Sequence, residues 1–466
     1  MSSDYRLTQA VKDLPAPPFL VSAIVEALFT SSYADSTWIV PGEADPFCVV
    51  AARDIASAQP GAEVVIFTND SDLIVYNSGP QTKVAMIDSI SERELGIVQT
   101  LEATAFWPQE LRKLSKEHLK DLVGPAYAMV DPYVTFTEAL KTAWRGSGTA
   151  AYDEFADTFS TAQAAEDLSR LKASRMHDEC MLQGYSKLTE LMYQAQDTSF
   201  RGPDSTDLYL YLSVLFEDPT RSTAWTVGTS IREVAVWEVK DCLGLDSDVF
   251  EYRRLGQRIA PVKLRALSSS EVQQSIAEWQ SIVESELAVP RSLSHIQHWR
   301  FLLMQMLLLE MVNGDMRMPT MQNVLSVLRS SAPTTWEQVH FLAHYQALYY
   351  SLGILHQVLD FTKRTLETAG MFEEIDAVLA DLPGIAQICN PECSGRNAVD
   401  EETWELLVEE FLSAKDIQLA KPVVESSGRS RKPKKKPKEL TASQSPKGRT
   451  KMKLSHSNPF AALADI

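Results

Sequence analysis

The sequence predicts an α/β segment near the N-terminus, then a large, mostly α-helical region, and finally a disordered basic tail. Three observations support this fold class. Helix-like and strand-like apolar patterns alternate over residues 19–87, as in an α/β layer. Helical periodicity dominates from Ser91 to about Ala420, with few credible strands. From about Val423 the chain is rich in Lys, Pro, Ser and Gly and has no apolar period, so no packed core is expected there.

The first elements are predicted from apolar spacing and from turn residues. Residues 19–28 follow two prolines and have helical spacing, and the β-branched and aromatic residues of 37–40 predict a short strand. Residues 45–58 have one apolar face and predict a second helix.

A buried strand is predicted at 63–68, after the turn residues of 59–61. Its apolar run is continuous, as expected for a strand covered on both faces of a parallel sheet. A further pair of strands is expected at 73–76 and 83–87, across the turn 77–80.

The later chain is divided by pattern and composition. Residues 336–366 and 401–412 are examples of long predicted helices. We expect one α/β domain over residues 1–145, a mostly helical region over 146–420 and the basic tail over 421–466.

Charge is distributed unevenly over the 466 residues. The net charge is −18, but the segment from Arg429 onward has eleven Lys and Arg against two acids, a net charge of +9. The preceding part has 33 Lys and Arg against 60 acids, a net charge of −27. The chain is therefore an acidic body with a basic tail, and strong binding of a polyanion by the body alone is not expected.

The cysteines and apolar segments exclude several protein classes. Five cysteines in so long a chain argue against a disulfide scaffold and indicate a reducing compartment. Cys389 and Cys393 have no second pair at zinc-site spacing. The most apolar segment, 301–309, is too short to cross a bilayer, and charges interrupt the N-terminal apolar stretch, so we expect a soluble, intracellular protein.

Two acidic pairs flank the predicted helix and the buried strand. Glu43 and Asp45 lie where the helix begins, and Asp70 and Asp72 directly follow the strand. Because ligands bind at the carboxyl ends of parallel strands, the second pair lies where a site is expected. Converging carboxylates favour Mg²⁺ or Mn²⁺, and two such ions can activate a water and cleave a phosphodiester. The structural alternative is that these residues are ordinary turn and helix-cap residues.

Residues 41–45 (Pro-Gly-Glu-Ala-Asp), the helix that follows and residues 66–76 (Ile-Phe-Thr-Asn-Asp-Ser-Asp-Leu-Ile-Val-Tyr) resemble the internal region of XPG and flap-endonuclease type nucleases. The variety looks like the asteroid-domain proteins, a PIN-like group. The match is close over 38–76, and weaker similarities are found at 17–21, 124–133, 228–232 and 251–256.

The resemblance implies a partial PIN-like three-layer sheet and a divalent-metal-dependent, structure-specific nuclease. Glu43, Asp45, Asp70 and Asp72 match the four positions that bind the catalytic metals, Mg²⁺ or Mn²⁺, in active relatives. The resemblance also implies a nucleic-acid substrate, a DNA flap or RNA, and a role in DNA repair.

Two departures from the family pattern weaken this expectation. The family's preceding region, whose first strand supplies an Asp, is not found before Glu43, and the downstream Gly-any-Asp-Tyr signature is not matched at Asp88 or Asp121. Without that strand an unpaired sheet edge is expected. With fewer carboxylates, metal binding is expected to be weak or absent.

Other catalytic motifs receive no support. His340 and His344 are one helical turn apart, but Phe341 replaces the Glu that a His-Glu zinc motif needs, so they are interpreted as surface or core histidines. The sequence contains no Walker motif, no dinucleotide-binding glycine motif and no nucleophile elbow.

The Lys- and Arg-rich run in 429–453 predicts a nuclear-localisation signal or a phosphate-contacting arm, with a merely solvated linker as the alternative. We therefore expect the nucleus as the location, with the cytoplasm left open. Residues 458–463, which begin Asn-Pro-Phe, are a candidate docking peptide for a protein partner, and no membrane partner is expected.

Two functions remain open from the sequence. The first is an asteroid-type protein derived from metal-dependent nucleases, with the four carboxylates as its site. The second is a catalytically inactive nuclear scaffold or RNA-associated adaptor.

Overall fold

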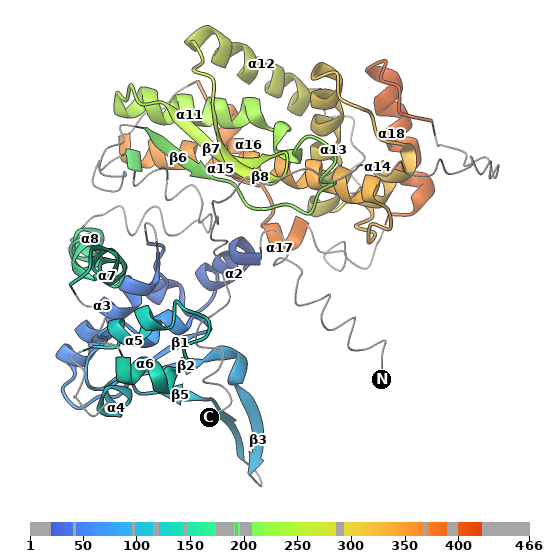
Figure 1. The fold of residues 1–466 in the computed structure, drawn as a ribbon. Coiled ribbons are helices and arrows are strands. Elements are labelled where there is room, and N and C mark those ends of the chain that lie inside the picture. The colour runs from blue at the N-terminus through green and yellow to red at the C-terminus, as the bar shows by residue number, and fades with distance from the viewer. Residues whose placement is uncertain are drawn as a thin grey trace, which may run out of the picture. The chain divides into compact units, whose positions relative to one another are not determined.

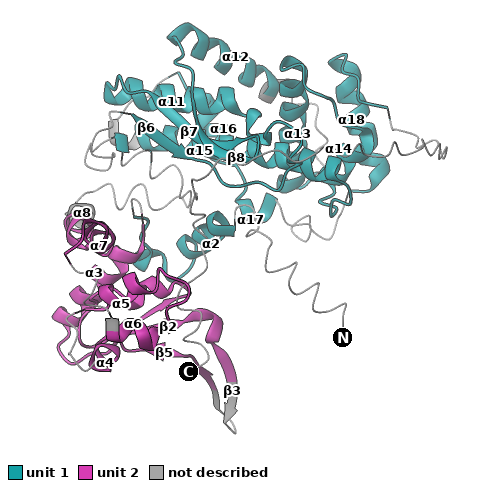
Figure 2. Ribbon diagram, viewed as in Figure 1, with its two compact units in different colours: residues 1–41, 175–424 teal, residues 42–174, 425–466 magenta. Residues whose placement is uncertain are grey.

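The chain folds into two compact units in the computed structural model (Figure 2). One unit, the helical unit, combines residues 1–41 with 175–424, and the other, the α/β unit, combines 42–174 with 425–466. This division assigns 20–40 to the helical unit. The structure describes residues 20–40, 43–95, 98–114, 121–142, 148–173, 191, 194–195, 207–285, 293–366, 371–388 and 399–421.

The α/β unit contains small sheets and short helices (Figure 1). Its described elements are α3 (Asp45–Ala58), β1 (Val64–Thr68), η2 (Ser71–Ile74), β2 (Thr82–Met86), η3 (Ile87–Ser89), β3 (Ser91–Leu95), β4 (Val98–Glu102), β5 (Ala105–Phe106), α4 (Pro108–Lys113), α5 (Val123–Ala128), α6 (Phe136–Thr142), α7 (Ala150–Asp157) and α8 (Ala162–Ala173).

The helical unit is larger and has one small sheet among its helices. Its described elements are α2 (Leu20–Phe29), η1 (Ala34–Ser36), β6 (Leu208–Tyr211), η7 (Ala224–Thr226), α11 (Thr229–Leu243), β7 (Val249–Leu255), β8 (Arg258–Lys263), α12 (Ser269–Ser285), α13 (His295–Asn313), α14 (Met321–Leu328), α15 (Trp336–Leu366), α16 (Glu373–Leu379), α17 (Ile385–Ile388) and α18 (Glu401–Ala414). An α/β part followed by a mostly helical part is therefore the fold class, as predicted.

The first sheet has the order β1-β2-β5. β1 and β2 are parallel, with Val64 opposite Thr82, and β5 is antiparallel to β2. Val64 and Ile66 of β1 belong to the core of this unit, together with Val49 and Ala52 of α3. β1 is an edge strand within the described residues, which agrees with the expected unpaired edge.

The predicted burial of β1 on both faces was wrong. Val64 and Ile66 are buried, but Val65 and Phe67 are 39% and 58% exposed. Successive side chains of a strand point to opposite faces, so one face of β1 packs on the core and the other is open. The continuous apolar run thus predicted the strand correctly, but it did not show that one face of the strand is exposed to solvent.

Two segments that were predicted as strands do not form strands. Residues 73–76 belong to a 3-10 helix and the turn after it, and 37–40 form no strand. Leu73 and Tyr76 are buried, so the segment is apolar because it fills the core as it connects β1 to the parallel strand β2. The helices predicted at 45–58 and 336–366 match α3 and α15.

Strands also form where helices were expected to dominate. β3 and β4 make an antiparallel hairpin, and β6, β7 and β8 make a second three-stranded sheet. β6 runs parallel to β7, and β8 is antiparallel to β7. The expectation of few strands beyond Ser91 was therefore wrong. Charged residues in β3 and Pro261 in β8 obscure the alternating pattern.

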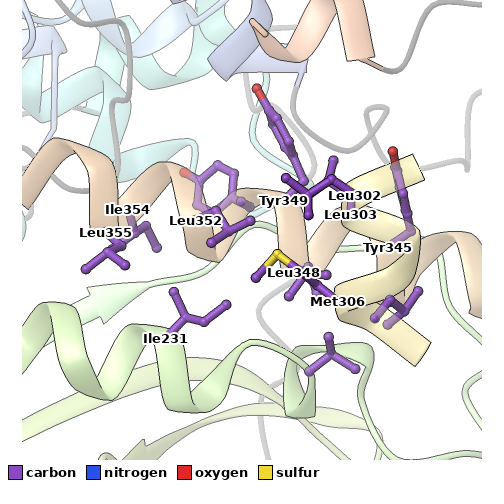
Figure 3. Packing of buried hydrophobic residues seen from close by; sticks show 14 of the residues in the cluster. Ile231, Leu302, Leu303, Met306, Tyr345, Leu348, Tyr349, Leu352, Ile354 and Leu355 are labelled. Atoms are coloured by element: carbon purple, nitrogen blue, oxygen red, sulfur yellow. The ribbon is translucent and has the colours of Figure 1, made fainter. Parts of the chain in front are cut away.

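The core of the helical unit is built mainly on α15. This helix contacts α11, α13 and α16, and Figure 3 shows Ile231 of α11, Leu303 of α13 and Leu348 of α15 in one apolar cluster. α13 is apolar on most sides, as expected for a helix surrounded by protein. Its N-terminus has a capping box between Ser294 and Gln297.

A buried ionic cluster joins two segments that the sequence left without a role. Arg232 of α11 and Glu251 of β7 both have fully buried side chains and form an ion pair at 2.8 Å. Arg232 also donates to the Ser351 hydroxyl of α15 at 2.7 Å and to the Trp225 carbonyl oxygen at 2.7 Å. This cluster connects residues 228–232 with 251–256, which explains their charged residues structurally.

No described helix is long and apolar enough to cross a membrane.

Candidate functional site

The two acidic pairs lie at the ends of α3 and β1 in the α/β unit. Asp45 is the first residue of α3 and Glu43 is two residues earlier. Asp70 caps η2, which begins directly after β1, and Asp72 lies in its first turn. α3 packs against both β1 and η2, so the fold brings the start of the helix toward the end of the strand.

The segment after β1 is ordered by hydrogen bonds of its own. The backbone N–H of Asp72 donates to Asp70 Oδ1 at 2.9 Å, and the backbone N–H of Asp70 donates to Thr68 Oγ1 at 2.8 Å. Asp70 is therefore a cap residue as well as a candidate ligand. Its second carboxylate oxygen is not used in this cap.

The four carboxylates share one electrostatic environment. Burial, followed by the charges of Asp70, Asp72 and Glu43 in that order, raises the pKa of Asp45 to about 6. Burial and then Asp70 also raise the pKa of Asp72. The charges of Asp70, Asp72 and Glu43 thus act on Asp45 from the loops beside it.

Tyr76 is a member of this neighbourhood that sequence reasoning missed. Burial raises the pKa of its hydroxyl to about 12, and Asp45 and Asp72 contribute most among the four carboxylates. Its hydroxyl donates to the Thr158 carbonyl oxygen at 3.2 Å. Tyr76 therefore remains neutral beside the carboxylates. The position of Tyr76 at the end of residues 66–76, the segment that resembles the nuclease family, could have indicated its proximity to the acids.

Asp88 also lies at this edge of the sheet. The side-chain oxygen of Asn69, after β1, accepts from the backbone N–H of Asp88, after β2, at 2.8 Å. Because the two strands are parallel, their carboxyl ends are adjacent. Sequence reasoning discounted Asp88 since it lacks the family's flanking residues, but the topology places its backbone beside the Asp70 segment.

A basic side chain supports the loop that follows η2. Arg53 of α3 donates through Nε to the Asn77 carbonyl oxygen at 2.7 Å and through one terminal nitrogen to Thr161 Oγ1 at 2.8 Å. These contacts join α3 to the β1–β2 connection and to the start of α8. Arg53 thus stabilises the elements that carry the acidic pairs.

The carboxylate oxygens of the four acids suit a hard divalent cation chemically, but the distances between them suit it only in part. Carboxylate oxygens are what Mg²⁺ and Mn²⁺ prefer. Among the described residues, however, no group of three or more His, Cys, Asp or Glu side chains is close enough to hold one ion. Two carboxylates with water in the remaining positions are a usual Mg²⁺ arrangement. Burial raises the pKa of the nearby Cys48 thiol, so it offers no thiolate.

The other sequence candidates do not join this site. His340 and His344 are buried in the helical unit, with ring centroids 4.5 Å apart. Of the two interpretations, surface or core histidines, the structure supports the second. The pair Cys389 and Cys393 and the basic tail lie outside the described residues.

Comparison with known proteins adds one family. A family model described as XPG domain containing matches residues 16–266, more than half of the chain. None of the curated proteins and none of the solved structures that were compared matches it.

Proposed function

Because the chain belongs to the family of XPG-domain proteins, in the asteroid-type variety, we propose that it hydrolyses phosphodiester bonds at the acidic cluster of Glu43, Asp45, Asp70 and Asp72 with a divalent metal ion. The family belongs to a nuclease-derived superfamily that generally uses divalent metals.

One observation carries the proposal. α3 and η2 pack together so that two acidic pairs from separate elements form one neighbourhood beside the carboxyl end of β1. Such a concentration of negative charge is costly to fold unless a cation or protons offset it. The raised pKa values of Asp45 and Asp72, to which the neighbouring carboxylates contribute, support the same arrangement.

The residues have separate roles in this proposal. Asp45 and Asp72, both half-buried, would hold a Mg²⁺ or Mn²⁺ ion, while Glu43 and Asp70, both exposed, would add ligands or bind metal-held water. The bound ion would polarise the phosphate and lower the pKa of a bound water. Asp70 also keeps the turn after β1 in place, and the neutral Tyr76 hydroxyl adds no charge beside the ion, since it donates its hydrogen bond to the Thr158 carbonyl oxygen.

The substrate and partners belong to the same proposal. A DNA flap or an RNA strand would bind at the acidic cluster, and the basic run in 429–453 would add sequence-independent attraction to phosphates. The same run would direct the protein to the nucleus, with the cytoplasm as the other location, and 458–463 would dock a protein partner. A role in DNA repair follows if flaps are the substrate.

A second candidate is a catalytically inactive scaffold or RNA-associated adaptor. The observation in its favour is the spacing of the carboxylates, since no three described ligands lie close enough for one ion. The cap made by Asp70 gives part of the motif a purely structural reason to be present.

Cleavage assays distinguish the two. Full-length protein with Mg²⁺ or Mn²⁺ is incubated with flap, hairpin and single-stranded substrates, and Asp45→Asn is compared with Glu154→Gln, an exposed acid on α7. We expect cleavage by the unmodified chain and by Glu154→Gln, and at least a hundredfold slower cleavage by Asp45→Asn, on the order of losing one charged interaction of about 3 kcal/mol. Equal rates in all three, or no cleavage of any substrate, would favour the scaffold.

A further inference from the structure

A cavity of about 310 Å³ lies in the helical unit at the C-terminal end of α11. Residues within 233–249 and the segment 264–267, which follows β8, line this cavity, and we call it the α11 cavity. Small-molecule sites have volumes of about 300–1,000 Å³, so the α11 cavity is large enough for a small ligand. Asp241, Gly244 and Asp246 on its wall are exposed, so a ligand can enter from solvent.

The floor of the α11 cavity is apolar and is part of the core of the helical unit. Val236, Val249 and Leu264 line the cavity, and all three are almost fully buried members of the core cluster. Trp237 and Leu245 also line it and are partly buried against the same cluster. Because these side chains are held in place by the core, the cavity is formed before a ligand binds.

The charged side chains around this floor are mostly acidic. Four carboxylates and two cations line the α11 cavity, which gives a net charge of −2. Two of the four carboxylates have partners, since Glu233 pairs with Arg265 at 3.7 Å and Asp248 pairs with Lys263. Arg265 also pairs with Glu271, so this cation is already occupied by two acids.

Asp241 and Asp246 carry the remaining negative charge of the α11 cavity. Both are exposed, and no ion pair is found for either of them in the described parts of the chain. Lys240, on the same wall, likewise has no ion pair among the described residues. The unpaired charges are therefore two acids against one cation, which favours a ligand with a positive charge over an anion.

The end of α11 adds to this negative charge. Gly244 ends the helix with a φ of +61°, and its N–H donates to the Asp241 carbonyl oxygen at 3.3 Å. A helix C-terminus carries a partial negative charge, so an acid in the last turn, as Asp241 is, is unfavourable unless a cation offsets it. No three acids among the described residues are close enough to hold a metal ion, so an organic cation fits this cavity better than a metal.

We propose that the α11 cavity binds a primary ammonium group carried on a short alkyl chain. The alkyl chain lies on Val249 and Leu264, and the ammonium group donates hydrogen bonds to the carboxylates of Asp241 and Asp246. The ring of Trp237 adds a surface that attracts organic cations. A free polyamine and the lysine side chain of a peptide both carry such a group, and binding assays distinguish these two sources.

This binding site goes beyond the proposed hydrolysis and does not depend on it. The α11 cavity belongs to the helical unit, whereas the acidic cluster belongs to the α/β unit. Amine binding is measured without a metal ion, so failure of one proposal leaves the other open. Asp45→Asn is expected to bind the amine as the unmodified chain does.

The first test is isothermal titration calorimetry of the full chain with pentylamine at low salt. Asp246→Asn keeps the size of the side chain but removes its charge, and it is expected to weaken binding about tenfold, the effect of losing one charge-assisted hydrogen bond. Glu405→Gln, which changes an exposed acid of α18 outside the cavity, is the control and should bind normally. Equal affinities in all three proteins, or no binding of pentylamine, would overturn the proposal.

The second test determines the sign of the ligand charge. Lys240→Met removes a like charge from the cavity wall, so pentylamine is expected to bind this variant about threefold more tightly. Pentanoate, which has a chain of similar length and a negative end, should bind the unmodified chain more weakly than pentylamine does. Unchanged or weaker binding of pentylamine by Lys240→Met, or a preference for pentanoate, would contradict a cationic ligand.

The third test addresses the location of the ligand and its source. Ala266→Trp places a large ring at an exposed position of the cavity lining, so it is expected to abolish binding, and urea unfolding checks that the variant is folded. Full affinity for pentylamine in folded Ala266→Trp protein would refute the site. Spermidine and Nα-acetyl-lysine amide are then compared on the unmodified chain. Tighter binding of spermidine identifies a free polyamine as the ligand, and tighter binding of the lysine derivative identifies a peptide.

Discussion

Gly228 is the residue whose backbone most restricts substitution. Its φ is +72°, and a Cβ built there would lie 2.4 Å from the Ser351 hydroxyl. Its N–H also donates to Glu310 Oε1 at 2.6 Å, a carboxyl whose pKa burial raises to about 6. A side chain at this position would disturb the start of α11 and the ionic cluster behind it.

We therefore expect Gly228→Ala to destabilise the protein by at least ~2 kcal/mol, from left-handed strain and steric overlap together. Gly244→Ala is the matched control, since Gly244 has φ +61° but nothing within 4 Å of a Cβ, and it should cost only ~1 kcal/mol. Urea unfolding measures both. Equal losses would mean that overlap with Ser351 does not matter.

His344 should make the protein sensitive to acid. Burial, followed by the charges of His340 and Arg221, lowers its pKa to about 3. In the unfolded chain the histidine takes up a proton below about pH 6.5, while in the folded chain it stays neutral to about pH 3. Its contribution to stability is complete above pH 6.5 and is lost as the pH falls toward 3.

The expected slope is up to ~1.4 kcal/mol per pH unit for this one proton. His344→Leu should flatten the loss of unfolding free energy between pH 6.5 and 4.5, whereas His295→Leu, an exposed histidine of α13, should not. Unfolding by urea at several pH values provides the comparison. An unchanged slope in His344→Leu would show that this proton is not involved.

At the scale of elements, the Arg232–Glu251 pair ties α11, β7 and α15 together. Both side chains are fully buried, and Arg232 satisfies its donors on Glu251, Ser351 and backbone oxygens. Removing Arg232 would leave the buried carboxylate of Glu251 with Arg253, at 3.0 Å, as its remaining cation and would remove the donor to the Ser351 hydroxyl.

We expect Arg232→Leu to cost about 3–5 kcal/mol of unfolding free energy. Lys263→Leu, which removes the exposed pair with Asp248, should cost less than ~1 kcal/mol. Denaturant unfolding of the two variants gives the contrast directly. A small loss of unfolding free energy for Arg232→Leu would mean that the buried cluster tolerates the removal of this positive charge.

Helices were easier to predict than strands for a physical reason. A helix such as α15 repeats its apolar spacing over 31 residues, and its pattern depends little on distant partners. The strand character of β6 and β8 depends on pairing with β7, and β6 has only four residues. The segment 73–76 has the sequence pattern of a strand because a buried connecting segment is rich in the same apolar residue types as a buried strand.

The candidate site was partly accessible from sequence. The four acids were predicted because they flank recognisable elements, and in the structure the other three contribute to the raised pKa of Asp45, although no three of the described acids are close enough to hold one ion. Asp88 and Tyr76 were missed as members of this site, since their proximity follows from the parallel pairing of β1 with β2 and from the path of η2. Pairing partners far apart in sequence are set by tertiary packing, which local patterns do not encode.

At the scale of the whole molecule, each unit has a separate apolar core. The core of the α/β unit contains Ile74, and that of the helical unit contains Leu355, both almost fully buried. Separate cores allow one unit to open without the other.

Ile74→Ala and Leu355→Ala should each cost about 2–5 kcal/mol, but in different places. Hydrogen exchange is expected to accelerate in β1 and β2 for Ile74→Ala, and in α13 and α15 for Leu355→Ala. The other unit serves as the internal control in each case. Faster exchange in both units from either change would indicate a single cooperative core.

The open side of β1 also bears on how the protein behaves in concentrated solution. An uncharged Val-Val-Ile-Phe-Thr strand with Phe67 exposed, which is at the edge of its sheet among the described residues, can pair with the same strand of another chain. Self-association through this strand, and eventually aggregation, is then limited mainly by electrostatic repulsion between the negatively charged residues 1–428 of different chains. High salt, which screens that repulsion, should therefore lower solubility, and Phe67→Lys should restore it.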